Sequence, residues 1–407
     1  MSLNPVHAIA GVVAPYRELL ATPGRRGFVF AAWLGRFPKS ALGLGLILMV
    51  ALTRDSYALA GAVSAVFVTG LALGGPQWSR AMDRFGQARV LAVGGSLLAV
   101  SATGLLLAIV LDWPVWSWFV LAALTGGTII DMGSAVRSRW AAQLTPDKRL
   151  PAFALESVND ELVFVISPPI VTVLAAVVHP ALGFGVGLAA GILGYIMFAV
   201  HPGAPRALST RARRTSRGIP IRVLGIVVTF VGMGAVFGSF DVSTVALATE
   251  EGTPAATGLI IGVFSLASVI AGAILGSRGS ARTRARRFVI AAACYAVVVP
   301  LLALSSTVLI ATLVCIAAGA VTSPLIITGL ALVEERADPF RLTETLAYPS
   351  AGLAVGGTIG ALAAGVAVDA HGAQAGLAVT AVAAVFAGLI AFGGEALLAQ
   401  RTRGTAR

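Results

Sequence analysis

The stretch GGPQWSRAMDRFGQARVL (residues 74–91) decides the fold of this 407-residue chain. Within ten residues it carries Arg80, Asp83, Arg84 and Arg89, and long apolar runs lie on both sides of it. The whole chain is 57% hydrophobic and only 12% charged, whereas about a quarter of the residues of a soluble globular protein are charged. A chain that confines its few charges to short connections between apolar runs is expected to cross a membrane several times.

The apolar runs are about 20 residues long, the length that a helix needs to cross the hydrocarbon core of a bilayer. They are continuous rather than alternating, which excludes the strands of a membrane β-barrel. With a mean hydropathy of +0.91, the chain is predicted to be an all-α membrane protein. Twelve transmembrane helices are predicted, over residues 28–51, 57–78, 89–111, 115–136, 152–177, 181–200, 221–243, 255–276, 287–305, 307–332, 344–368 and 373–396.

The positive charges fix the orientation of these helices. Of the 29 lysines and arginines, all except Arg36, Lys39 and Arg54 fall in the two terminal segments or in the even-numbered connections. Cytoplasmic connections carry an excess of Lys and Arg, so we expect a multi-pass protein of the cytoplasmic (inner) membrane with both termini cytoplasmic. Anionic membrane lipid is then the expected partner of the net charge of +11, and nucleic-acid binding is unnecessary as an explanation.

A basic stretch rich in Pro and Gly separates six predicted spans from six others, which indicates an internal duplication of the kind common in transporters. The expected organisation is a cytoplasmic N-terminal segment (1–27), a six-helix bundle (28–200), a basic cytoplasmic linker (201–220), a second six-helix bundle (221–396) and a cytoplasmic tail (397–407).

The ends of the second and eighth spans match each other, because both finish Gly-rich and open into an Arg-rich connection. Here SRAMDRFGQAR resembles the loop signature of the major facilitator superfamily, Gly-x-x-x-Asp-Arg-x-Gly-Arg-Arg/Lys. The matching residues are Asp83, Arg84, Gly86 and Arg89. Ser79 stands in place of the first Gly, Gln87 and Ala88 replace cations, and the second copy keeps Gly276 but lacks the Asp.

This resemblance, to the prokaryotic twelve-span type, covers essentially the whole chain. It implies the fold of that superfamily, with two pseudo-symmetric six-helix bundles, and secondary transport by alternating access. It also implies that spans one, four, seven and ten line the central cavity, and that the loop is a cytoplasmic gate. Gly86 permits a tight turn, and Asp83 is expected to latch onto a helix N-terminus, where negative charge is favoured. Arg80 and Arg89 are interpreted as topological anchors.

Charges inside a span are costly and are functional candidates by default. Arg36 and Lys39 lie three residues apart near the middle of span one, so they share a helical face. Pro38 between them is expected to kink the helix. These cations should line a water-filled cavity, with Asp131 of span four, the only charge in the predicted membrane portion of that span, as the partner of one of them.

Span five opens with Glu156, Asp160 and Glu161. Mutual repulsion favours protonation of one carboxylate in such a cluster, so Asp160 and Glu161 join Asp131 as candidate proton carriers. Glu156 is expected to pair with Lys148 or Arg149 at the cytoplasmic edge. Asp241, toward the outer end of span seven, is a gate candidate or an interfacial residue. The alternative for the pairing of spans one and four is a buried ion pair that only fixes helix register.

We expect a secondary transporter that moves a small organic solute, with proton-coupled efflux by antiport favoured over proton-coupled nutrient uptake by symport. Arg36 and Lys39 favour an anionic substrate. A lipid flippase and a non-transporting membrane protein stay open as alternatives. The chain has no phosphate-binding glycine loop and no metal-spaced cluster in its sequence, so we expect no enzyme activity, no metal and no cofactor. The protein is expected to be a monomer.

Overall fold

The computed structural model describes residues 17–201, 220–277, 284–337 and 342–404, and within these residues every regular element is a helix. Twelve helical segments are long and apolar enough to cross a membrane. The boundary between spans nine and ten, which the sequence marks only by LSST around Ser305, is present between Leu304 and Val308. The predicted linker lies almost wholly outside the described residues.

The first six spans form one bundle. They are α2 and α3 (Arg25–Leu34 and Phe37–Arg54), α4 (Tyr57–Phe85), α5 (Gln87–Val110), α6 and α7 (Val115–Thr128 and Met132–Gln143), α8 with the π-helix η1 (Pro146–Val173 and Leu174–Val178) and α9 (Pro180–Val200).

The other six spans form the second bundle. They are α10 (Ile221–Glu250), the 3₁₀ turn η2 with α11 (Pro254–Ala256 and Thr257–Ser277), α12 with the 3₁₀ helix η3 (Arg284–Val298 and Val299–Leu304), α13 (Val308–Arg336), α14 (Leu342–His371) and α15 (Ala373–Gly404).

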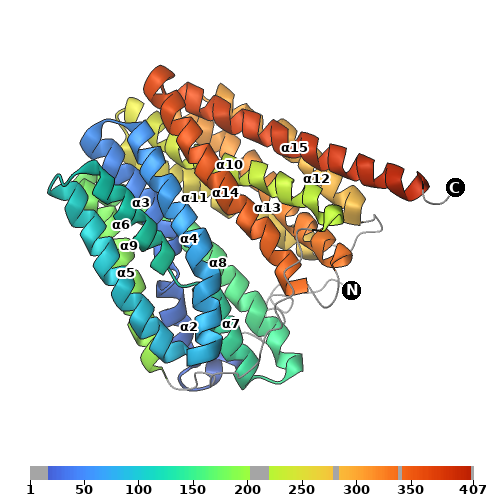
Figure 1. Ribbon diagram of the computed structural model, residues 1–407, viewed down its shortest axis with the longest axis horizontal. Helices are drawn as coiled ribbons and strands as arrows, with labels where there is room; N and C mark the ends of the chain where they lie inside the picture. The colour runs from blue at the N-terminus through green and yellow to red at the C-terminus, as the bar shows by residue number, and fades with distance from the viewer. Residues whose placement is uncertain (1–16, 202–219, 278–283, 338–341, 405–407) are drawn as a thin grey trace, which may run out of the picture.

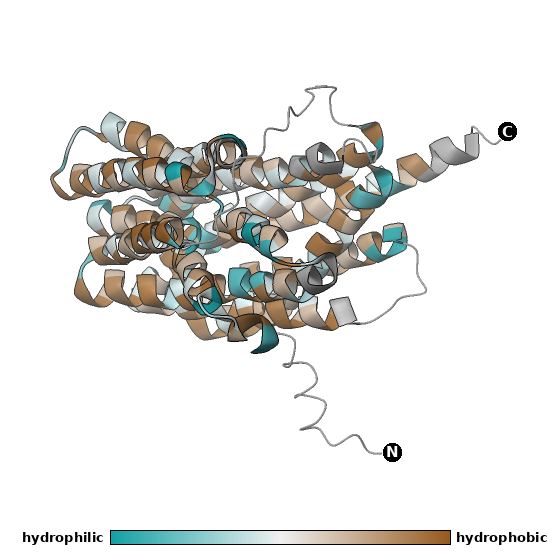
Figure 2. Ribbon diagram, turned by 90° about the horizontal axis from the view of Figure 1, so that it is seen from below, coloured by the Kyte–Doolittle hydropathy of each residue, from teal (hydrophilic) through white to brown (hydrophobic). Residues whose placement is uncertain are grey.

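The outward surface of the helices is apolar, as a bilayer requires. Large side chains such as Val100 (73% exposed) and Leu389 (66% exposed) lie on it, and Figure 2 shows hydrophilic residues at helix ends and in the middle of the molecule. Span one is the exception among the twelve, because 78% of its most apolar window is buried inside the protein. It is therefore enclosed by its neighbours rather than by lipid.

The two bundles meet at one end and diverge at the other (Figure 1). We call the face where the described chain begins and ends the terminal face, and the other the opposite face. Helices α4 and α14 touch near the opposite face, where Gly61 packs on Ala361 and Gly365 packs on Tyr57. Helices α8 and α11 also touch there, where Gly258 packs on Pro169. The space between the bundles thus widens toward the terminal face.

Candidate functional site

Span one is broken at the position of its two cations. Helix α2 ends at Leu34 and α3 begins at Phe37, with Arg36 at the cap and Pro38 in the first turn. Proline cannot donate a backbone hydrogen bond and clashes with the preceding turn, so the predicted kink at Pro38 is confirmed. Gly194 of α9 lies directly against Gly35 at this break, which leaves the freed backbone buried in protein, as a membrane interior demands.

Span four is broken beside it, between Thr128 and Met132. The Tyr195 hydroxyl accepts from the Ile130 N–H at 2.9 Å and donates to the Ile130 carbonyl at 3.1 Å. One buried side chain therefore satisfies both backbone groups of Ile130 at the break. Met132 packs against Gly35 of span one, so the two breaks lie side by side.

Lys39 and Asp131 meet at these breaks. The Lys39 Nζ lies 3.6 Å from Asp131 Oδ1, and the two side chains are 51% and 43% exposed. Their exposure contrasts with the rest of α3, where Pro38, Ser40 and Ala41 are all buried. The expected contact between Asp131 and one of the span-one cations is thus present for Lys39.

Arg36 has different partners from the expected one. Its Nη2 lies 2.7 Å from Glu156 Oε2 and its Nε lies 2.6 Å from Asp160 Oδ1, both on α8. Arg36 and Glu156 are buried, and the Trp140 indole donates to Glu156 Oε1 at 2.8 Å. Glu156 is therefore no edge residue paired with the cations near the start of α8. It lies about 15 Å into that helix, beside span one.

Asp160 is shared between two arginines, because Arg137 Nη2 binds its second oxygen at 2.6 Å. Arg137 belongs to α7, which continues span four to Gln143. This helix runs seven residues beyond the predicted end of span four at Val136, so Arg137 lies on the continuation of span four and not in a loop.

Glu161, unlike Glu156 and Asp160, is not part of the arginine cluster. It is exposed, and within the described residues no hydrogen bond or ion pair holds it. It shares a helical face with Val165 and Pro169, which lie against Gly262 of α11. Glu161 is one turn nearer the terminal face on this side of α8.

Asp241 lies on α10, between a face that packs on α14 and a face that packs on α11. Gly238 contacts Gly357 of α14, and the Phe240 ring lies 5.1 Å from the Phe264 ring of α11. Asp241 is half-buried, and no ion pair holds its carboxylate in the described part of the chain. It is placed among helices that border the gap between the bundles.

The model of the major facilitator superfamily matches residues 28–339, most of the chain. The chain belongs to the major facilitator superfamily. No curated protein matches it by sequence.

Solved transporters share its fold. A mutant of the nucleoside transporter NupG has a TM-score of 0.74 at 12% identity, over 91% of this chain and 98% of that one. A peptide transporter POT in complex with sulfate has 0.67 at 16%, over 91% and 94%, and the human organic anion transporter MFSD10 (TETRAN) has 0.63 at 12%, over 91% and 100%. At these identities the likeness is one of fold alone, so the solute of this superfamily member must be argued from its own residues.

The superfamily loop has the expected turn. Gly86 alone separates α4 from α5 and has a φ of 83°, which favours glycine. The Arg84 guanidinium lies 5.1 Å from the Phe85 ring centroid, and Arg89 is exposed. The side chain of Asp83 lies outside the described part, so its expected role as a latch stays a prediction.

A second buried arginine was not recognised from the sequence, which placed Arg139 in a loop. Arg139 is fully buried, donates to Gln87 Oε1 at 3.1 Å and to the Phe198 carbonyl at 3.1 Å, and stacks 3.7 Å over the Phe198 ring. Gln87 in turn donates to the Ala135 carbonyl at 2.8 Å. The loop motif could have indicated this buried arginine, because the neutral Gln87 stands where the motif has a cation, and a cation there would repel Arg139.

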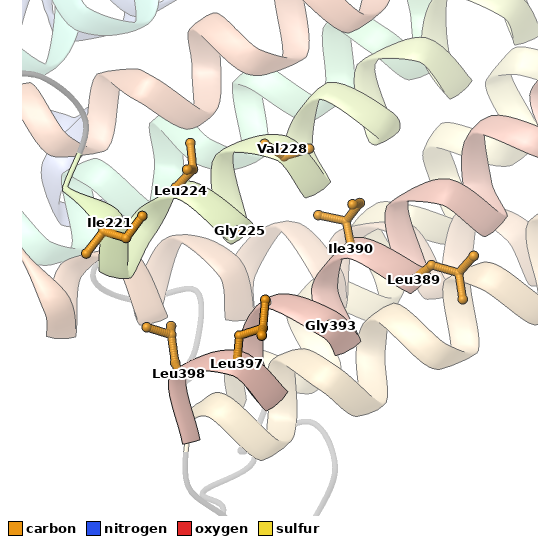
Figure 3. Close-up of a pocket in the computed structure, with 10 residues that line it drawn as sticks. Ile221, Leu224, Gly225, Val228, Leu389, Ile390, Gly393, Leu397 and Leu398 are labelled. Carbon is orange, nitrogen blue, oxygen red and sulfur yellow. The ribbon is translucent and has the colours of Figure 1, made fainter. Parts of the chain in front are cut away.

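A hollow of about 330 Å³ lies between α10 and α15 (Figure 3). It is lined by no polar side chain; the lining residues are Ile221, Leu224, Gly225, Val228, Leu389, Ile390, Gly393, Gly394, Leu397 and Leu398. A polar solute would find no partner there, so the candidate site of this transporter stays at the paired helix breaks. In the described residues no group of three His, Cys, Asp or Glu side chains is arranged to hold a metal.

Proposed function

We propose that this superfamily transporter exports a small organic cation across the cytoplasmic membrane in exchange for protons, with both termini in the cytoplasm. One observation carries the proposal: the exposed Lys39–Asp131 pair at the breaks of spans one and four, inside the most enclosed span of the protein. Charges facing acyl chains would be costly, so their exposure is best explained by an aqueous vestibule between the bundles.

The balance of charge favours a cation. Within spans one, four, five and seven, away from their ends, lie four cations and five carboxylates: Arg36, Lys39, Arg137, Arg139, Asp131, Glu156, Asp160, Glu161 and Asp241. Arg36 was one of two cations behind the expectation of an anionic substrate, and it is already held by two carboxylates. Among these carboxylates, Glu161 and Asp241 have no ion pair within the described residues, and they attract a cation.

Unpaired carboxylates allow exchange of solute for protons, because the proton and the cationic solute compete for the same group. A carboxylate that holds a proton is neutral and no longer attracts a cation, and a bound cation disfavours the proton. Proton and solute therefore exclude each other, which is the requirement for antiport. The bundles, closed at the opposite face and divergent at the terminal face, would in this orientation admit solute from the cytoplasm.

Proton–anion symport is the second candidate, because protonation of Asp131 would release Lys39 to bind an anionic solute. Antiport and symport differ in the sign of the proton change when the solute binds.

We expect organic cations to release protons from the purified protein in weakly buffered detergent solution, and we expect Glu161→Gln and Asp241→Asn to reduce that release. Asp112→Asn, on the opposite face beside Arg54, is the matched control and should behave as wild type.

Measurement of solute transport across a membrane is the second part of the test of antiport. In proteoliposomes with an acidic lumen, external organic cations should accumulate, and collapse of the pH gradient should stop accumulation. Proton uptake on binding of organic anions, with accumulation driven by an acidic exterior, would contradict antiport and establish symport.

A further inference from the structure

Helix starts on the opposite face are capped by carboxylates from neighbouring helices. Glu250 Oε1 accepts from the Ala373 N–H of α15 at 2.7 Å, and Glu251 Oε1 accepts from the Val308 N–H of α13 at 3.1 Å. The first N–H groups of a helix have no partner within the helix, and negative charge is favoured beside them. Both glutamates end α10, so these two caps join helices of the same bundle.

A third cap of the same kind crosses between the bundles. Asp369, near the end of α14, accepts from the Tyr57 N–H at 2.6 Å, from the Ala58 N–H at 2.9 Å and from the Ser56 hydroxyl at 2.9 Å. All three donors belong to the start of α4, in the other bundle. One carboxylate thus accepts from two of the first N–H groups of a 29-residue helix that belongs to the other bundle.

This cap ends a continuous contact between α4 and α14. One turn inward, Gly365 lies against the Tyr57 carbonyl, and further inward Gly61 lies against the Ala361 carbonyl. Small residues allow such close helix packing in membranes. Asp369 can reach the N–H groups of α4 only while these backbones touch, so its three hydrogen bonds exist only when the opposite face is closed.

We propose that Asp369 is the latch of the opposite face: its carboxylate holds the N-terminus of α4 in the closed state and releases it when that face opens. The proposal rests on the alternating access inferred above. Hydrogen bonds to an ionised group weaken steeply beyond about 3.2 Å, so separation of α4 from α14 breaks all three. The caps made by Glu250 and Glu251 lie within one bundle and persist.

The test measures the distance between the bundles at the opposite face. Spin labels at Leu111→Cys, at the end of α5, and Leu304→Cys, at the end of η3, occupy exposed positions on different bundles. The background carries Cys294→Ser and Cys315→Ala, which removes the cysteines of the chain. Loss of a helix cap costs about 1 kcal/mol, so Asp369→Ala should shift the ratio of open to closed distances about fivefold toward open.

Glu251→Gln is the matched control, because it alters a cap within one bundle and should leave the distance distribution unchanged. An unchanged distribution in Asp369→Ala would overturn the latch, and so would an equal shift in Glu251→Gln. If Asp369→Ala fails to fold, Asp369→Asn keeps the side-chain size, removes the charge and is judged by the same ratio. The measurement needs neither solute nor pH gradient, so a wrong assignment of cation antiport leaves its outcome unaffected.

Discussion

Arg36 is a buried cation that two carboxylates of α8 share. Arg36 is 6% exposed, and its guanidinium holds Glu156 and Asp160 together. The second oxygen of Glu156 accepts from Trp140, and that of Asp160 accepts from Arg137. Burial of two charges costs free energy that only good geometry and further hydrogen bonds offset. The cluster therefore acts as one unit that fixes spans one, four and five around the helix breaks.

Replacing Arg36 tests whether the cluster stabilises the protein. We expect Arg36→Ala to lower the free energy of unfolding by about 3–5 kcal/mol, because the buried Glu156 loses its cation. Titration with SDS in mixed micelles measures the change. Arg284→Ala is the control: its partner Glu335 is 3.5 Å away and both side chains are about half exposed, so the loss should stay near 1 kcal/mol. Equal losses in the two variants would contradict the role given to Arg36.

At this scale the sequence predicts which residues are unusual, and not which of them touch. Asp131 was expected to meet Arg36 or Lys39, because charges at mid-depth need partners, and it meets Lys39. The pairing of Arg36 with Glu156 was missed, because it depends on how α8 is rotated and placed against span one, which no local pattern encodes. Arg139 was missed because a helix end hidden in a polar stretch is hard to locate.

The broken helices are the elements that give the site its shape. The breaks of spans one and four lie together because α9 presents Gly194 to Gly35 and Tyr195 to Ile130. A side chain at position 194 would push α9 away from the break. Span six thus supports the site without contributing a charge to it.

Two glycines on α9 allow a matched comparison. A Cβ at Gly194 would overlap the backbone of Gly35, whereas a Cβ at Gly185 would meet only Leu106 Cδ1 at 3.8 Å, an ordinary contact. We expect Gly194→Ala to destabilise the protein by about 1–3 kcal/mol through overpacking and to reduce solute binding. Gly185→Ala should be close to neutral. Unfolding in mixed micelles and binding by proton release measure both, and similar behaviour of the two variants would contradict this account of α9.

Among the elements, the twelve spans and the kink at Pro38 follow from apolar run length and from proline chemistry, and both were predicted. The break at Ile130 was not. It carries no proline, and its open backbone is paired by side chains of other helices: the Tyr195 hydroxyl pairs both groups of Ile130, and the Trp78 indole donates to the Gly127 carbonyl. A break stabilised from another helix leaves no local trace in the sequence.

For the whole molecule, the twofold repeat of the sequence predicts the two bundles, since each copy must bury its own helix faces. The repeat does not predict which face is closed. That depends on small differences between contacts such as the cap by Asp369 and the glycine contacts of α4 with α14. Alternating access requires these contacts to be reversible, so they are individually weak and carry no strong pattern.

A cross-link between the bundles tests whether transport needs the opposite face to open. The hydroxyls of Thr69 and Thr358 lie 3.1 Å apart across α4 and α14. In the background without native cysteines, oxidation of Thr69→Cys with Thr358→Cys should abolish solute flux in proteoliposomes, because the face stays shut, and a thiol reductant should restore it. Either single cysteine, treated in the same way, should transport normally. Full cross-linking on a gel together with undiminished flux would contradict alternating access between these bundles.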